Sequence, residues 1–361
     1  RVISIMSDLA STNDSAAALA NAGDVAALVN AMKFHIGDAD MMEKAVNVLD
    51  AMSNFEHLKE SLSSFEYIET INNAIWAHIA VEKLVLKGTR VLHQLSTENP
   101  VVVGYEMQVK VQDTMKHALE QHAEKKDVNV EVFWCLGNLL LGEEENRSLV
   151  CTACCDAIIA ALGRWYEDAE LLEVMLKAVG NISLDDDAII MMVEKACTSK
   201  IVGAMKHHTE NEEVLKLAIM VISNFGAIND EEKDAYATGF IINEGGTHAV
   251  KDCMENMPDS VGIVEAAMEA LFNLGNDVDA AVDLAELGVM ELTMSSIQKF
   301  DYEADLLSWA IKFLSVFTYA EVTLERYGRE RPRAKQGGER SRVASEAGWR
   351  AKQGGERSRV A

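Results

Sequence analysis

Clusters of carboxylate side chains are the residues of this sequence that could most directly do chemistry. Grouped carboxylates bind divalent cations through their oxygens or act as general acids and bases. The clusters are Glu143, Glu144 and Glu145; Asp185, Asp186 and Asp187; Asp230, Glu231 and Glu232; and Asp277 with Asp279. Each begins 4 to 6 residues after an asparagine that lies within an apolar segment. Clusters that recur at one place in a repeating pattern indicate a periodic acidic rim and not a single active site.

Other residue types that could support catalysis or metal binding lack the partners they need. Cys151 and Cys154 form a C-x-x-C, but no second pair or suitably spaced histidine pair accompanies it, so a structural zinc site is disfavoured and core packing is expected. His207 and His208 are expected at a helix end, where imidazole can interact with free carbonyls. There is no nucleophile elbow, phosphate-binding glycine loop or complete EF-hand loop. The sequence therefore predicts a non-enzymatic protein with no catalytic residue, no metal and no cofactor.

The asparagines are the anchors of an internal repeat. The clear copies are VLDAMSNFEH, VFWCLGNLLLG, MLKAVGNISLDDD, IMVISNFGAINDEE and MEALFNLGNDVD, with weaker copies at Asp8, Gln94 and Ser315. Asn138, Asn181 and Asn224 lie 43 residues apart, and a period in the low forties is typical of armadillo or HEAT arrays. Apolar residues recur at helical spacing within each period, and a second apolar segment precedes each anchor helix, often after a glycine corner such as NEGGTHAV.

This three-helix unit resembles the armadillo repeat family, with HEAT repeats as the alternative. The resemblance implies an all-α fold, a right-handed α-solenoid of about seven to eight repeats over residues 1–325, the first of them partial. Such repeats bury their apolar faces only against their neighbours. Residues 326–361 contain an exact repeat, RAKQGGERSRVA, and are expected to form a basic, disordered tail.

In armadillo proteins the third helices line a concave groove, and an asparagine of that helix commonly bonds the backbone of an extended peptide. The resemblance therefore implies a partner-binding row comprising Asn54, Gln94, Asn138, Asn181, Asn224 and Asn273. Trp134 precedes Asn138 by four residues, the pairing used by importin-α-type receptors, but the corresponding positions hold Asp50, Lys177, Met220 and Glu269, which disfavours a nuclear import receptor. Alternatively, the Gly-Asn pairs let adjacent helices approach, the asparagines bond neighbouring carbonyls, and Trp134 is a packing residue.

Charge indicates the kind of partner. After residue 325 there are eleven Lys and Arg against four Asp and Glu, so the tail carries a charge of +7. Because the whole chain carries −25, residues 1–325 carry −32. An acidic body repels nucleic-acid phosphates and attracts basic segments. The carboxylates of the rim also have a structural interpretation, because acidic residues in the first turn of a helix cap its free N–H groups. The basic tail is a candidate for intramolecular contact with the rim.

We therefore expect a scaffold or adaptor that binds an extended basic segment of another protein in an Asn-lined, acid-rimmed groove. A structural component of a cytoskeletal or ciliary assembly, and a regulatory domain of a longer enzyme, are the alternatives. No apolar run reaches the length of a membrane span, and six cysteines within apolar helical segments indicate reduced thiols. The cytoplasm is the expected compartment, with the nucleus as the alternative.

Overall fold

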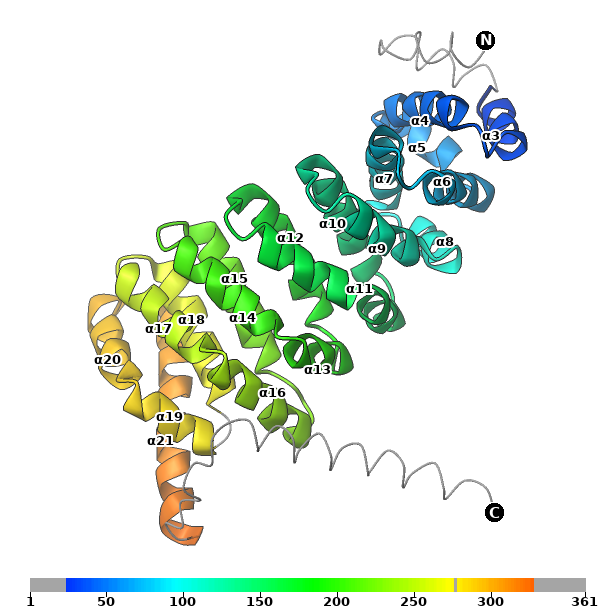
Figure 1. Cartoon of the computed structure of the whole chain (residues 1–361). Helices are drawn as coiled ribbons and strands as arrows, with labels where there is room; N and C mark the ends of the chain where they lie inside the picture. The colour runs from blue at the N-terminus through cyan, green and yellow to red at the C-terminus, as the bar shows by residue number, and fades with distance from the viewer. Residues whose placement is uncertain (1–23, 276–277, 328–361) are drawn as a thin grey trace, which may run out of the picture. The chain divides into compact units, whose positions relative to one another are not determined.

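A computed structural model of the protein describes residues 24–275 and 278–327, with side chains described except at 24, 278–279 and 319–327. Every regular element in these ranges is a helix, which confirms the all-α prediction (Figure 1). Asp8, Asp277 and the predicted tail from residue 328 onward lie outside the described residues, as does the side chain of Asp279. Helix α21 continues to Tyr327, two residues past the expected end of the solenoid.

The helices follow the predicted three-helix repeat. The first helices are α5 (Glu56–Leu62), α8 (Pro100–Gln108), α13 (Asp186–Glu194), α16 (Glu231–Asn243) and α19 (Val278–Glu286). The second helices are α3 (Asp24–Phe34), α6 (Phe65–Ala77), α9 (Val111–Gln121), α14 (Cys197–His207), α17 (Gly246–Asn256) and α20 (Val289–Lys299). The third helices are α4 (Ala39–Ser53), α7 (Glu82–Ser96), α10 (Lys126–Leu140), α12 (Ala169–Ile182), α15 (Glu212–Phe225), α18 (Val261–Leu274) and α21 (Ala304–Tyr327). In one repeat the first two helices are fused into α11 (Glu144–Arg164).

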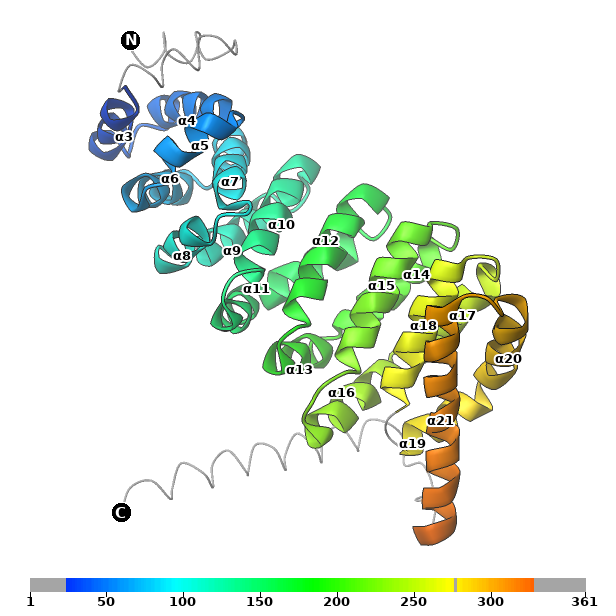
Figure 2. The same ribbon diagram turned by 180° about the vertical axis from the view of Figure 1, so that it is seen from behind.

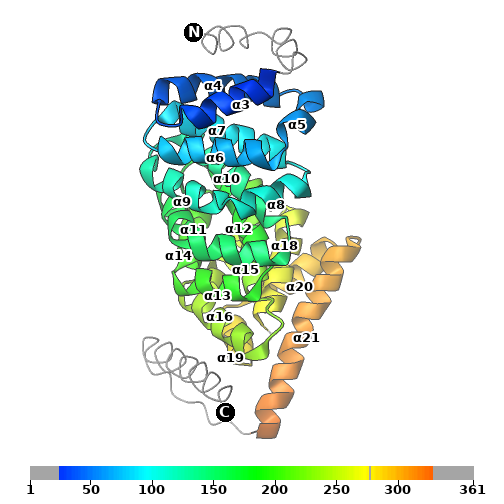
Figure 3. The same cartoon turned by 90° about the vertical axis from the view of Figure 1, so that its right-hand side faces the viewer.

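The chain forms two compact units, residues 1–221 and 222–361. In unit 1 the third helices α4, α7, α10 and α12 pack each against the next, and α11 packs against α9, α10, α12, α13 and α14 (Figures 1 and 2). In unit 2, α18 packs against α17 and α21, and α21 also packs against α19 and α20. Figure 3 shows α21 in orange as the longest helix of that unit. Each unit thus buries apolar helix faces against neighbouring repeats, as a solenoid requires.

The corner between first and second helices has one conformation in four repeats. Gly245 and Gly288 take positive φ angles of 85° and 76°, and Lys110 and Ala196 take the same left-handed conformation at 59° and 61°. Glycine adopts these angles without steric cost, whereas a side chain pays about 1–2 kcal/mol. The glycine corners seen in the sequence are therefore real corners, and two further corners hold a residue that is strained there.

A row of ring nitrogens links consecutive second-to-third helix turns in unit 1. The Nε2 atoms of His78, His122 and His208 lie 2.6, 2.7 and 2.7 Å from the carbonyl oxygens of the preceding repeat, at Ile36, Ile79 and Tyr166 respectively. Trp165 occupies the same place in its repeat and donates Nε1–H to Ala123 O at 3.1 Å. The predicted helix-end position of His208 is confirmed, and its partner is a carbonyl of the previous repeat.

Helix α11 is the one described helix long and apolar enough to cross a membrane by length and composition. Its apolar window is 56% buried inside the protein, and α11 packs against five other helices of unit 1. A buried core helix of a helical protein passes the same test. This helix is therefore weak evidence for a membrane span.

Candidate functional site

The expected partner-binding residues of unit 1 lie on one surface, which we call the third-helix face. It is formed by α4, α7, α10 and α12, and its central positions are Asp50, Arg90, Trp134 and Lys177, each four residues before an anchor. One helical turn separates each of these side chains from its anchor, so the two point the same way. Lys177 is exposed, Arg90 is half-buried and Asp50 is buried. The face therefore carries both signs of charge.

A chain of ion pairs runs across the third-helix face. Arg90 donates Nε–H to Glu131 Oε1 at 2.6 Å, and His93 Nδ1 lies 2.7 Å from Glu131 Oε2. On the other side, Arg90 Nη1 and Lys87 Nζ lie 3.9 and 3.8 Å from the carboxylate of Asp50. Burial would raise the pKa of Glu131, but the close contact with His93 and the hydrogen bond from Arg90 outweigh it and lower this pKa. At Asp50 burial prevails over the attraction of Arg90 and Lys87, and the pKa is raised.

Most of the asparagine row uses its amide N–H groups to join neighbouring repeats. Asn138 donates Nδ2–H to His93 O at 2.8 Å and to the hydroxyls of Ser96 and Thr97 at 3.1 and 3.2 Å. Asn181 donates to Gly137 O at 3.5 Å. In unit 2, Asn273 donates to the hydroxyl and carbonyl oxygens of Ser223 at 3.0 and 3.4 Å. These bonds to the preceding third helix match the structural interpretation of the row.

The amide oxygens of this row differ in whether they accept a hydrogen bond. Within the described residues, Oδ1 of Asn138, Asn181 and Asn273 accepts no hydrogen bond, although each of these side chains is only half-buried. Asn54 Oδ1 instead accepts from Gln94 Nε2 at 3.1 Å, and Gln94 Oε1 accepts from Ser53 at 2.6 Å. Asn224 takes part in an interaction within the chain. Three acceptors in the row thus remain for a ligand.

Trp134 is the large aromatic side chain of the third-helix face. It is 43% exposed, and its ring stacks on His93 with a centroid distance of 6.5 Å and an interplanar angle of 28°. Because His93 is held by Glu131 and its carbonyl by Asn138, the surface beneath the indole is fixed. A rigid, half-exposed indole is a typical anchor for a binding partner.

The glycines of the Gly-Asn pairs differ in role. A β-carbon at Gly180 would lie 2.9 Å from Met220 Cε, so the next third helix uses the space that this glycine leaves. A β-carbon at Gly137 would meet nothing within 4 Å. Close helix approach therefore accounts for Gly180 and not for Gly137.

The acidic rim divides into carboxylates that cap helices and carboxylates that do not. Asp185 accepts from Ala188 N at 2.7 Å, and Asp230 accepts from the backbone of Glu232 and Lys233 at 3.1 Å each. Glu143 occupies the same N-cap place before α11 without a side-chain bond. The exposed rim residues are Glu143, Glu144, Glu145, Asp187, Asp230, Glu231 and Glu232, with Asp186 half-buried. Capping thus explains Asp185 and Asp230 but leaves Glu143 unexplained.

The cysteines lie in the core. All six are buried, and desolvation raises the pKa of Cys154 and of Cys253 to about 12. The described residues contain no group of three or more His, Cys, Asp or Glu side chains placed to hold a metal ion.

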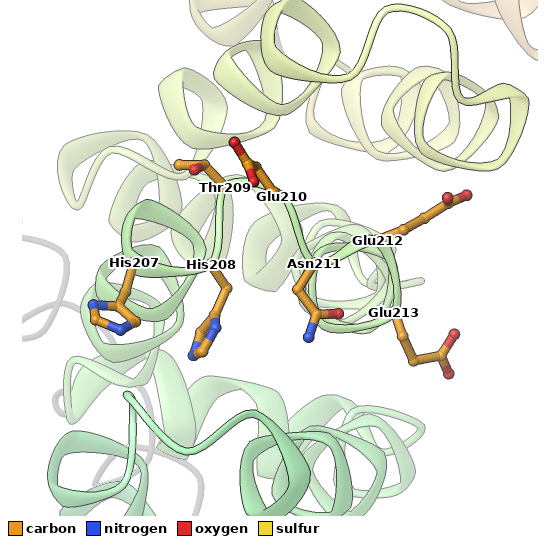
Figure 4. A pocket seen from close by; sticks show the side chains of 7 residues that line it. All are labelled: His207, His208, Thr209, Glu210, Asn211, Glu212 and Glu213. Carbon is orange, nitrogen blue, oxygen red and sulfur yellow. The ribbon is translucent and has the colours of Figure 1, made fainter.

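A shallow hollow of about 660 Å³ lies at the turn between α14 and α15 (Figure 4). It is lined by His207, His208, Thr209, Glu210, Asn211, Glu212 and Glu213. His207 packs edge-on against Tyr166 at 5.4 Å, His208 bonds the Tyr166 carbonyl, and Asn211 caps α15 through Val214 N at 3.1 Å. These polar groups serve the turn itself.

The ring-nitrogen row has a signal in the sequence. His35, His78, His122, Trp165 and His208 recur at intervals of 43 or 44 residues, the same period as the anchors. The contacts of Glu131 with Arg90 and His93 had no such signal, because these residues come from different positions of two repeats.

Comparison with known proteins identifies the fold. No protein-family model and no curated protein matches the chain. A computationally designed armadillo repeat protein for modular peptide recognition is similar in structure, with a TM-score of 0.57 at 17% identity over 69% of this chain and 98% of its own. A designed armadillo repeat protein in complex with the peptide (KR)4 has a TM-score of 0.56 at 18% identity, over 69% and 98% of the two chains. A structure from work on the interaction between cadherin and beta-catenin has a TM-score of 0.53 at 11% identity, over 90% and 72%. These likenesses show an armadillo-type repeat fold, an α-solenoid.

Proposed function

We propose that this protein is a non-enzymatic scaffold that binds an extended, basic segment of a partner protein along the third-helix face. The observation that carries the proposal is Trp134, a fixed and 43% exposed indole beside the free Oδ1 of Asn138. Armadillo-type structures support protein binding in general, since one designed neighbour is bound to a peptide. The identity of the bound segment as basic is our inference from charge.

The amide oxygens supply backbone recognition. Asn138 and Asn181 have already committed their N–H donors to the preceding helix, which fixes the direction of each side chain. Their Oδ1 atoms then accept N–H groups of an extended chain, without reading its sequence. Asn54 and Gln94 bond each other, so they contribute less than the sequence suggested.

Charge supplies attraction and position. The exposed carboxylates of the rim, with the −32 charge of residues 1–325, steer a basic segment toward the protein. Arg90 and Lys177 lie on either side of Trp134 in the row, and their positive charge repels the basic side chains of the ligand. Those side chains therefore point to the acidic rim, and the aliphatic parts of the ligand cover the indole of Trp134. A Lys-Arg peptide binds the designed neighbour.

Two tryptophans allow a matched test on the full chain. Trp134 and Trp76 are 43% and 50% exposed, and each contacts one histidine ring, but Trp76 lies on the second helix α6. We expect a fluorescent (KR)4 peptide to bind the wild-type protein, the Trp134→Ala variant to bind it at least about tenfold more weakly, and the Trp76→Ala variant to bind it as wild type does. Equal losses in both variants, or none in Trp134→Ala with thermal midpoints unchanged, would refute the proposed site.

A further inference from the structure

Five large apolar side chains are exposed along one edge of unit 1, which we call the first-helix edge. They are Phe65, Val101, Leu141, Leu149 and Leu184, with exposed fractions of 38%, 58%, 66%, 54% and 57%. Val101 lies on the first helix α8, Leu149 on the first-helix part of α11, and Leu141 and Leu184 in the turns that enter α11 and α13. Phe65 begins α6 and packs edge-on against Tyr105 of α8 at 5.7 Å.

This concentration is greater than the usual scatter of exposed apolar residues. The described part of unit 1 exposes nine large hydrophobic side chains, and these five share the edge. The other four are Phe34 and Trp76 on second helices and Trp134 and Met220 on third helices. Single exposed apolar residues need no explanation, whereas a contiguous group marks an interaction site. The edge is therefore a candidate docking surface separate from the third-helix face.

The residues come from elements that lie side by side. A β-carbon at Gly142 would be 2.9 Å from Val103 Cγ1, so the turn that holds Leu141 rests on α8. Cys151 Sγ lies 3.8 Å from Ala188 O, which places the first part of α11 beside α13. Figures 1 and 2 both show α8, α11 and α13 following one another along this edge.

The charge around the edge is negative. Glu143, Glu144 and Glu145 are exposed between Leu141 and Leu149, and no ion pair engages them within the described residues. Glu98 precedes α8 and the aspartates 185–187 precede or begin α13. Arg147 is the one basic residue in segments 98–109, 141–150 and 184–194. An apolar strip set among carboxylates complements a surface that is apolar and basic.

The spacing of the repeats indicates the shape of the partner's surface. Leu141 and Leu184 occupy the same place in consecutive repeats, and packed helices lie about 8–10 Å apart. Residues i and i+7 of a helix are about 10.5 Å apart on one face. We propose that the first-helix edge docks a basic amphipathic helix of a partner protein, whose apolar stripe covers Val101, Leu141, Leu149 and Leu184 and whose flanking lysines or arginines pair with Glu143–Glu145. This site does not depend on the proposed function of the third-helix face.

A model peptide tests the proposal on the full chain. The probe is a fluorescent Leu/Lys amphipathic helix of about 18 residues, long enough to span about three repeats, with a scrambled peptide of the same composition as control. We expect the helix to bind wild type, and the triple variant Leu141→Ser, Leu149→Ser, Leu184→Ser to bind it at least about tenfold more weakly. Phe34→Ser, which removes an 86% exposed phenylalanine from the second helix α3, should bind as wild type does. A triple variant with Glu143→Gln, Glu144→Gln and Glu145→Gln should bind the helix more weakly than wild type does, and its binding should depend less on salt.

Each other outcome overturns the proposal. The proposal is wrong if the scrambled peptide binds as well as the helix, if the leucine variant binds the helix as well as wild type does, or if wild type binds no helix at about millimolar peptide. It is also wrong if wild type forms dimers that the leucine variant does not form, because the edge would then serve self-association. Because the substituted leucines are exposed, the thermal midpoint should stay unchanged, so lost binding reports the surface. The Trp134→Ala variant should bind this helix normally, which separates failure here from failure of the third-helix site.

Discussion

Glu106 makes the stability of the protein depend on pH in an unusual direction. This glutamate on α8 is fully buried, and within the described residues neither carboxyl oxygen has a hydrogen-bond partner. Ser96 lies near this carboxyl, but its hydroxyl donates to Leu92 O at 3.0 Å. Burial therefore raises the pKa of Glu106 well above its usual value of 4.5, and the proximity of Ser96 offsets this only in part. The folded protein therefore keeps this carboxyl protonated to a higher pH than the unfolded chain does.

The consequence for stability follows from proton linkage. In the unfolded chain Glu106 loses its proton above pH 4.5, whereas the folded protein keeps it until the raised pKa is reached. The free energy of unfolding therefore falls with rising pH across that window, by at most about 1.4 kcal/mol per pH unit. Glu106→Gln replaces the protonated carboxyl by a neutral side chain of the same shape and removes this loss. The variant should match wild type near pH 4.5 and become progressively more stable than wild type above it.

Urea unfolding followed by circular dichroism, from about pH 4.5 to about pH 8, measures the difference between variant and wild type. Glu131→Gln is the matched control, because His93 and Arg90 lower the pKa of Glu131. That carboxylate stabilises the fold above the unfolded-state pKa and loses this effect as the pH falls, so the variant should be less stable than wild type near neutral pH. A difference for Glu106→Gln that stays constant with pH would refute the reasoning.

Three further outcomes follow from local geometry. Ala196→Gly should stabilise the protein by about 1 kcal/mol in urea unfolding, because the left-handed corner at φ 61° suits glycine. Asn138→Ala should cost about 2 kcal/mol, since it removes the donor to His93 O and two hydroxyls, while Asn54→Ala at an exposed position should cost less than about 1 kcal/mol. Burial raises the pKa of Cys154 and Cys253 to about 12, so a disulfide reagent should modify them about 10³-fold more slowly than a free thiol until urea unfolds the chain.

Periodicity explains why the fold could be predicted from the sequence. Each repeat places apolar residues at the same helical positions, so the three-helix unit and its corners could be read without tertiary information. The fusion of two helices into α11 could not be predicted. The segment GEEENRSLVCTACCDAI differs from the corresponding segments of the other repeats only in lacking a glycine corner. Lys110 and Ala196 form such corners without any glycine, since stacking outweighs their strain.

The candidate site was predictable only at the level of residue positions. The asparagine anchors were found, but whether an amide faces a ligand or a neighbouring helix depends on side-chain direction across a repeat boundary. Asn138 shows both, with its N–H groups bonded to α7 and its oxygen without a partner in the described chain. The ion pair of Arg90 and Glu131 joins residues 41 positions apart, and single-sequence reasoning has no rule for such pairs.

The most direct test of the central claim is to map where an extended basic segment binds. A (KR)4 peptide carrying a benzophenone group would be cross-linked to the full chain by light, and the attached residues identified by mass spectrometry. The account predicts cross-links on α10 and α12, around Trp134 and Lys177, that excess unlabelled peptide suppresses. Suppressible cross-links confined to the second helices, or to residues 328–361, would contradict it.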